Sequence, residues 1–119
     1  MAATKNYRDL IVWQKSMDLV LEIYRITRFL PNDELYGLCS PMRRAAVSIP
    51  SNIAEGQQRI SEKEFVRFLS IARGSNAEIE TQLEICIRLG YLVKPSVINA
   101  EQLCSEIGKM LNSLVTKYA

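Results

Sequence analysis

The residues best suited to chemistry are polar side chains that recur every three or four positions between residues 44 and 59. They are Arg44, Ser48, Asn52, Glu55 and Arg59. Side chains at this spacing share one side of an α-helix, so an amide, a hydroxyl and a carboxylate would lie in one row. Glu55 precedes Arg59 by four positions, which is the favourable order for a helical ion pair.

Glu78 places a second carboxylate on an otherwise apolar side of a later helical segment. It shares that side with Ile71, Ile85 and Leu89. A buried carboxylate without a partner is strongly unfavourable, so this one would need a partner. One interpretation is an acid–base site made of Asn52, Glu55 and Glu78. The interpretation that we favour is a structural hydrogen-bond network that fixes the helix register, formed by Ser48, Asn52, Glu55 and Glu78.

Several classes of active site are excluded because the chain contains no histidine. Serine–histidine and cysteine–histidine nucleophiles, histidine-containing zinc sites and the di-iron site of helical bundles all require one. Phosphate-binding and dinucleotide-binding glycine motifs are also absent from the sequence. The three cysteines lack metal-ligand spacing, and Cys86 and Cys104 fall among apolar positions typical of core thiols. The sequence therefore predicts no catalytic residue, no metal and no cofactor.

Basic residues form a second candidate site, for phosphate groups. The candidates are Arg43, Arg44, Arg59, Lys63, Arg67 and Arg73. Glutamates are interspersed with them and the formal net charge is only +2, so one copy would present a mixed-charge face. An oligomer would repeat the patch, and affinity for phosphates grows with the number of contacts. Phe65, Phe68 and Trp13 are expected in the core, so no platform for stacking single-stranded bases is predicted.

Helical periodicity indicates that these residues lie on four helices. The pattern predicts an all-α, antiparallel up-down-up-down four-helix bundle, in a single domain over residues 1–119. The helices are expected at about residues 10–29, 41–58, 62–89 and 97–117. Asp9, Ser40 and Ser96 are expected at helix starts, Ser61 and Glu64 form a capping box, and Gly90 suits a helix end.

The second helix contains a proline at its middle, Pro50. Proline has no amide hydrogen, so it should kink the helix and free a carbonyl near Ala46. The inward row of this helix is rich in small residues that allow another helix to approach closely. That row comprises Leu38, Met42, Ala45, Ala46, Ile49, Ile53 and Gly56.

The first helix carries two apolar rows, which together exceed the stripe needed for packing within one chain. One row contains Leu10, Trp13, Met17, Val20, Leu21 and Tyr24, and the other contains Val12, Leu19, Ile23, Ile26 and Leu30. We interpret the excess as an oligomer interface. The predicted intersubunit residues are Val12, Leu19, Ile23 and Ile26.

A cytoplasmic location is expected. Residues 1–9 contain no apolar run of the kind found in a secretory signal. The longest uncharged apolar-leaning stretch, residues 45–54, is about half the length of a membrane span.

The stretch Ser48-Ile49-Pro50-Ser51-Asn52-Ile53-Ala54-Glu55-Gly56 resembles the bacterial proteins encoded in intervening sequences of 23S ribosomal RNA genes. The similarity continues through residues 65–69, 71–75 and positions 78 and 81, and includes residues 10–14 and 36–38. Residues 39–41 depart from the family pattern.

The resemblance implies an antiparallel four-helix bundle that assembles as a homopentamer. The fold is similar to that of the accessory variability proteins of diversity-generating retroelements, which act with a reverse transcriptase and bind nucleic acid. No enzymatic activity is implied. The leading prediction is thus a non-enzymatic oligomer that binds RNA or a nucleoprotein. Two alternatives stay open: an adaptor that binds protein through exposed apolar surface, and an enzyme that uses Glu55 or Glu78 as general acid or base.

Overall fold

The computed structural model describes residues 6–119, and in that range it contains helices and no strands. The four long helices are α1 (Ile11–Thr27), α2 (Ser40–Gln57), α3 (Glu62–Arg88) and α4 (Lys94–Tyr118). Short 3₁₀ helices cover Tyr7–Asp9 and Asn32–Glu34, and a π-helical turn covers Leu35–Cys39. The expectation that the N-terminus is no secretory signal depends on residues 1–9, of which residues 1–5 lie outside the described range.

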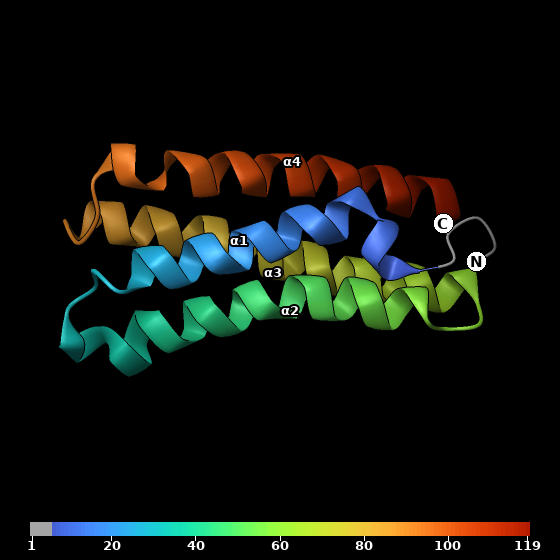
Figure 1. The fold of residues 1–119 in the computed structure, drawn as a ribbon, viewed down its shortest axis with the longest axis horizontal. Coiled ribbons are helices and arrows are strands. Elements are labelled where there is room, and N and C mark those ends of the chain that lie inside the picture. The colour runs from blue at the N-terminus through green and yellow to red at the C-terminus, as the bar shows by residue number, and fades with distance from the viewer. Residues whose placement is uncertain (1–5) are drawn as a thin grey trace.

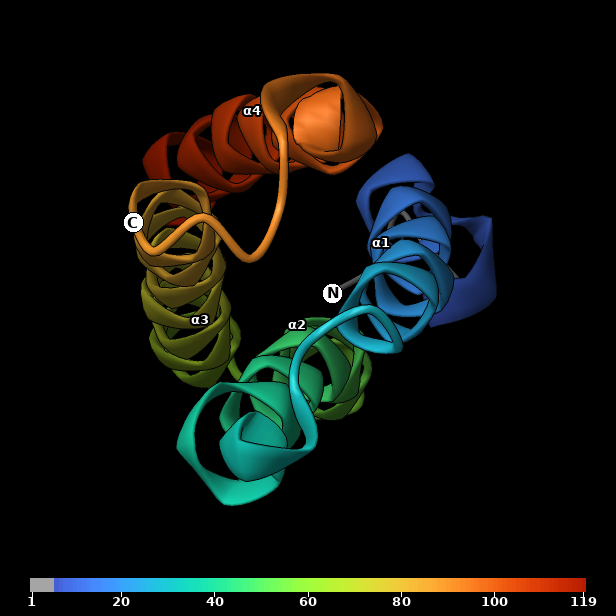
Figure 2. The same cartoon turned by 90° about the vertical axis from the view of Figure 1, so that its left-hand side faces the viewer.

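The helices run alternately up and down and form an elongated bundle (Figure 1). Seen from one end, they occupy four corners in chain order, α1 to α4 (Figure 2). Each helix packs against its two neighbours, and α4 closes the ring against α1. The predicted antiparallel four-helix bundle is therefore confirmed.

One apolar cluster fills the space between the four helices. Its largest fully buried side chains include Leu19, Ile23, Met42, Leu69 and Ile107. At about 25 cal/mol per Å² of apolar surface removed from water, a core of this kind is the main source of stability. All three cysteines are free and buried within it.

The helix starts differ from the predicted caps in three places. The N-cap of α1 is Leu10, because Asp9 belongs to the preceding 3₁₀ helix. Helix α2 continues directly from the π-helical turn, so Ser40 lies inside helical structure and caps no free end. Helix α4 begins at Lys94, and the Ser96 hydroxyl donates to the Val93 carbonyl one turn earlier.

The two ends of α3 carry residues that the sequence pointed to, although the Glu64 carboxylate pairs with Arg67 and so supplies no second half of the capping box. The Ser61 hydroxyl accepts a hydrogen bond from the Glu64 amide at 3.1 Å and caps α3. Gly90 follows α3 with a φ of 78°, a left-handed conformation that glycine adopts without strain. Helix α2 passes through the buried Pro50 without interruption, and the kink there stays a prediction.

The prediction that Val12, Leu19, Ile23 and Ile26 lie between subunits is wrong. All four side chains are buried in the core of the single chain. The opposite side of α1 is exposed and carries Ile11, Met17, Leu21 and Tyr24. The sequence shows two apolar rows on this helix, but periodicity alone does not tell which of them faces the other helices.

Gly56 lies where α2 and α3 approach each other closely. A Cβ atom at this position would lie 2.7 Å from Cβ of Phe68, closer than two carbon atoms can pack. Gly74 on α3 is the opposite case, because a Cβ atom there would meet nothing within 4 Å. The two glycines therefore have different structural roles although both lie within helices.

We expect Gly56→Ala and Gly74→Ala to change stability in opposite directions. Overpacking typically costs about 1–3 kcal/mol, whereas replacing an exposed helical glycine by alanine gains roughly 0.5–1 kcal/mol. Chemical denaturation should thus show a lower free energy of unfolding for Gly56→Ala and a higher one for Gly74→Ala. Stabilisation by both substitutions would contradict the close packing at position 56.

Candidate nucleic-acid interface

The six basic candidates lie at different parts of the bundle. Arg43 and Arg44 lie in the first turns of α2, and Arg59, Lys63 and Arg67 lie around the turn between α2 and α3. At 1.5 Å per residue, the two ends of α2 are about 25 Å apart. Five of the six candidates therefore form two separate basic regions on one chain, and Arg73 lies farther along α3.

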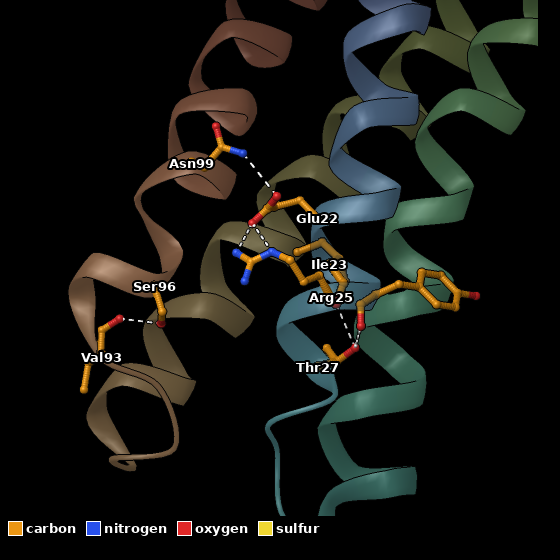
Figure 3. A network of polar contacts seen from close by, with 8 residues as sticks. Glu22, Ile23, Arg25, Thr27, Val93, Ser96 and Asn99 are labelled. Atoms are coloured by element: carbon orange, nitrogen blue, oxygen red, sulfur yellow. Dashed lines mark hydrogen bonds and ion pairs between the residues drawn. The ribbon is translucent and has the colours of Figure 1, made fainter.

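Arg43 is held against α1 by two contacts. Its Nε donates a hydrogen bond to Thr27 Oγ1 at 2.9 Å, and its guanidinium carbon lies 4.6 Å from the centre of the Tyr24 ring. Thr27 is itself fixed, because its buried hydroxyl donates to the Ile23 carbonyl at 2.7 Å. Figure 3 shows the Thr27 hydroxyl directed back at its own helix. Arg43 is thus positioned through its Nε, and among residues 6–119 it has no carboxylate partner.

Arg44 is exposed and borders two cavities. The larger, of about 640 Å³, lies between α1 and α2 and is lined by Tyr24, Ser40, Arg43, Arg44, Val47 and Ser48. The smaller, of about 220 Å³, lies between α2 and α3 and includes Ser75 and Glu78 in its lining. In the described part of the chain no ion pair neutralises Arg44.

Arg59 and Arg67 are neutralised by glutamates. Arg59 forms an ion pair with Glu55 at 2.6 Å, as the spacing predicted, and Arg67 pairs with Glu64 at 3.2 Å. Both guanidinium groups also lie over the Phe68 ring. The hydrogen bond from Arg67 lowers the pKa of Glu64, which keeps this carboxylate charged beside the arginine. A phosphate would have to compete with both glutamates for these arginines.

Lys63 and Arg73 are exposed residues of α3. Arg73 lies three residues before Asn76, whose side-chain amide donates to the Cys104 carbonyl of α4 at 2.9 Å. Residues three apart share a side of a helix, so Arg73 faces toward α4 and away from the α2 arginines. The structure does not bring all six candidates onto one surface.

The polar row on α2 forms a compact hydrogen-bond network with α3. The Asn52 amide donates to the Ser48 carbonyl at 2.7 Å and to the Ser48 hydroxyl at 2.9 Å. The Ser48 hydroxyl also lies 2.9 Å from the hydroxyl of Ser75 on α3. Ser75 is therefore a member of the network that the sequence analysis missed.

Glu55 and Glu78, which the sequence placed with Asn52 in an acid–base site or in the structural network, have different partners in the structure. Glu55 pairs with Arg59, whereas Glu78 lines the smaller cavity with Arg44 and accepts a hydrogen bond from Gln82 at 3.3 Å. Glu78 is exposed, so the expected penalty of burying a charge does not arise there. The structure thus supports the network at Ser48 and Asn52, with Ser75 added, but among the described residues no hydrogen bond joins Glu55 or Glu78 to it, contrary to the interpretation that we favoured.

Residues 8–113 match the model of the 23S rRNA-intervening sequence proteins. This chain belongs to that family. The match covers all of α1, α2 and α3 and most of α4, so it includes both basic regions and the polar network. The resemblance in the residues around Asn52 is thus confirmed at the level of the family.

A solved structure from the S23 ribosomal protein family has the same fold. It is a protein of unknown function from Bacteroides thetaiotaomicron VPI-5482, with 29% sequence identity and a TM-score of 0.81. The alignment covers 88% of this chain and 98% of that one. None of the curated proteins matches this chain.

Another polar cluster of this family member, unanticipated from the sequence, links α1 to α4 (Figure 3). Glu22 forms an ion pair with Arg25 and accepts a hydrogen bond from the Asn99 amide at 3.1 Å. These contacts, the hydrogen bond from Arg25 first, lower the pKa of Glu22. Arg25 is therefore neutralised, and the cluster serves helix packing.

The described residues offer few groups for a reactive thiol or a metal site. Burial raises the pKa of the Cys86 thiol to about 11 and that of Cys104 to about 12, so both are protonated near neutral pH. Residues 6–119 contain no group of three or more acidic or cysteine side chains placed to hold a metal ion. In the same range, no helix is long and apolar enough to cross a membrane.

Two residues important for the site, Thr27 and Tyr24, were not singled out as site residues from the sequence. Both belong to α1, while the arginine that they contact belongs to α2. The only signal was Tyr24 in an apolar row, and only the helix packing shows that its ring lies beside a guanidinium group. By contrast, Phe65 and Phe68 are buried as predicted.

Proposed function

We propose that this chain is a non-enzymatic, cytoplasmic bundle that binds RNA, alone or within a nucleoprotein, through the first turns of α2. The observation that carries this proposal is the difference between the two basic regions. Arg43 and Arg44 have no carboxylate partner among the described residues, whereas Arg59 and Arg67 each have one. Unpaired arginines give more favourable phosphate contacts, because no existing ion pair must first be broken.

The proposal includes assembly into an oligomer, with a pentamer as the expected form. The exposed apolar side chains of α1 and α3 supply candidate contact surfaces on two sides of α2. These side chains are Met17 and Leu21 on α1, and Ile71 and Ile85 on α3. Repetition of Arg43 and Arg44 around a ring would multiply the number of phosphate contacts, which offsets the low net charge of one copy.

The test is binding of the purified protein to structured ribosomal RNA across a salt series. We expect affinity to fall steeply with salt, because each phosphate contact releases counterions and contributes about 0.9 to the logarithmic slope on duplex nucleic acid. If the purified protein forms its oligomer, as its mass in solution shows, and still does not bind RNA at low salt, the proposal is contradicted.

An adaptor function is the second candidate, and one feature favours it. Phe29 and Tyr36 are exposed apolar side chains in the connection between α1 and α2, with Tyr36 84% accessible. Exposed aromatic residues of this kind are common at protein interfaces. A complex with another protein that is insensitive to salt and is lost in Tyr36→Ser would favour this function over RNA binding.

A further inference from the structure

The cavity between α1 and α2 has the size and the composition of a binding pocket for a small anion with an apolar part. Its volume of about 640 Å³ lies within the usual range of ligand pockets, about 300–1,000 Å³. Its charged side chains, Arg43 and Arg44, are both basic, and its remaining lining is hydroxyl, aromatic and aliphatic. No acidic residue contributes to this lining.

Arg43 is oriented in a way that suits an oxyanion. Thr27 occupies the Nε hydrogen, which leaves the two terminal nitrogens of the guanidinium group for a ligand. A guanidinium group fixed in this manner can donate two parallel hydrogen bonds to a phosphate. Because Thr27 is buried and bonded to the Ile23 carbonyl, the geometry is set before any ligand arrives. Arg44 supplies a second positive charge at the same cavity.

The rest of the lining suits a ring more than a second charge. Tyr24 is 39% exposed and Val47 is 41% exposed, so both side chains are accessible to a ligand in the cavity. Arg43 lies over the Tyr24 ring, so a planar ligand could stack on the ring or on the guanidinium plane. The Ser40 hydroxyl adds a polar group at the wall of the cavity.

We propose that this cavity is a nucleotide subsite, in which Arg43 and Arg44 bind the phosphate and Tyr24 and Val47 contact the base. The inference rests on the proposed RNA-binding function: one nucleotide of the bound RNA would occupy this cavity. Thr27 is a positioning residue, because it acts on the ligand only through Arg43. Base identity is not selected, since the lining groups offer stacking and apolar contact.

The experiment is a titration of the full chain, followed by the NMR shifts of its backbone amides, with three probes: inorganic phosphate, adenosine and adenosine 5′-monophosphate. We expect saturable shifts at Tyr24, Ser40 and Val47. Stacking of one base is typically worth about fivefold or more in affinity, so the nucleotide should bind at least about fivefold more tightly than phosphate. It should also bind about tenfold more tightly than adenosine, which lacks the anion. Equal affinity for nucleotide and phosphate, or for nucleotide and adenosine, would overturn the proposal. Amide shifts confined to residues outside the cavity would overturn it too.

Variants test the assigned roles. Arg43→Gln should weaken nucleotide binding about tenfold or more. Arg88→Gln is the matched control, because it removes the same charge from an exposed ion pair on α3 and should leave nucleotide affinity unchanged. Thr27→Val should weaken binding several-fold, and Thr27→Ser, which keeps the hydroxyl, should restore it. Equal loss in Thr27→Val and Thr27→Ser, with both variants folded, would contradict the positioning role.

The nucleotide titration and the RNA-binding assay can fail independently of each other. If RNA binding depends on Arg43 and Arg44 but the nucleotide produces no shifts at the cavity, the function stands and the subsite is overturned. If the nucleotide binds at the cavity and RNA does not bind, the proposed function fails and the cavity is a site for free nucleotides.

Discussion

An Ile23→Asp variant is expected not to fold. Ile23 lies in α1 with no accessible surface, in the cluster shared by all four helices. A carboxylate there would have no partner, and an unpaired buried charge costs several kcal/mol. That cost is comparable to the whole stability of a small domain, about 5–15 kcal/mol. Circular dichroism should show loss of helix, or a melting temperature lowered by tens of degrees.

Leu21→Asp is the matched control, because it introduces the same residue two positions earlier on the same helix. Leu21 is 71% exposed, so the monomer fold should persist with nearly unchanged helical content. If the exposed side of α1 forms the subunit contact, this variant should instead have a lower oligomeric mass by light scattering. If the Ile23→Asp protein folds and has a lower oligomeric mass, the row of Val12, Leu19, Ile23 and Ile26 forms the subunit interface and does not belong to the core.

This pair of variants also shows what the sequence could and could not predict. The helices and their approximate ends followed from apolar periodicity and from residues such as Ser61 and Gly90, because those signals are local. Which apolar row of α1 faces inward is decided by the other three helices, so Ile23 was assigned to the wrong side. The π-helical turn at Leu35–Cys39 likewise lacks a local signal.

The candidate site was predicted less completely than the fold. Pairing of Glu55 with Arg59 followed from their spacing, because both lie on one helix. The contacts of Arg43 with Thr27 and Tyr24 join α2 to α1, and the Ser48–Ser75 contact joins α2 to α3. Contacts of this kind depend on how α1, α2 and α3 align along their lengths, which a single sequence does not specify.

Arg43→Gln/Arg44→Gln is expected to have the largest effect on function. Hydrogen bonds to charged groups are typically worth about 1.5–3 kcal/mol each, so loss of two should weaken RNA binding by about 100-fold or more. The logarithmic salt slope should also become shallower by about 2 for each copy that contacts the RNA. Stability should change little, because Arg44 is exposed and Arg43 contributes one side-chain hydrogen bond.

The most direct test of the account is a comparison of this variant with Arg59→Gln/Arg67→Gln in the same RNA-binding assay. Both variants lose two positive charges, and both should keep the wild-type oligomeric mass. We predict that the second variant binds within about threefold of wild type, because Glu55 and Glu64 already neutralise the arginines that it lacks. Equal loss of affinity in the two variants would show that overall charge governs binding, and would contradict a site at the start of α2.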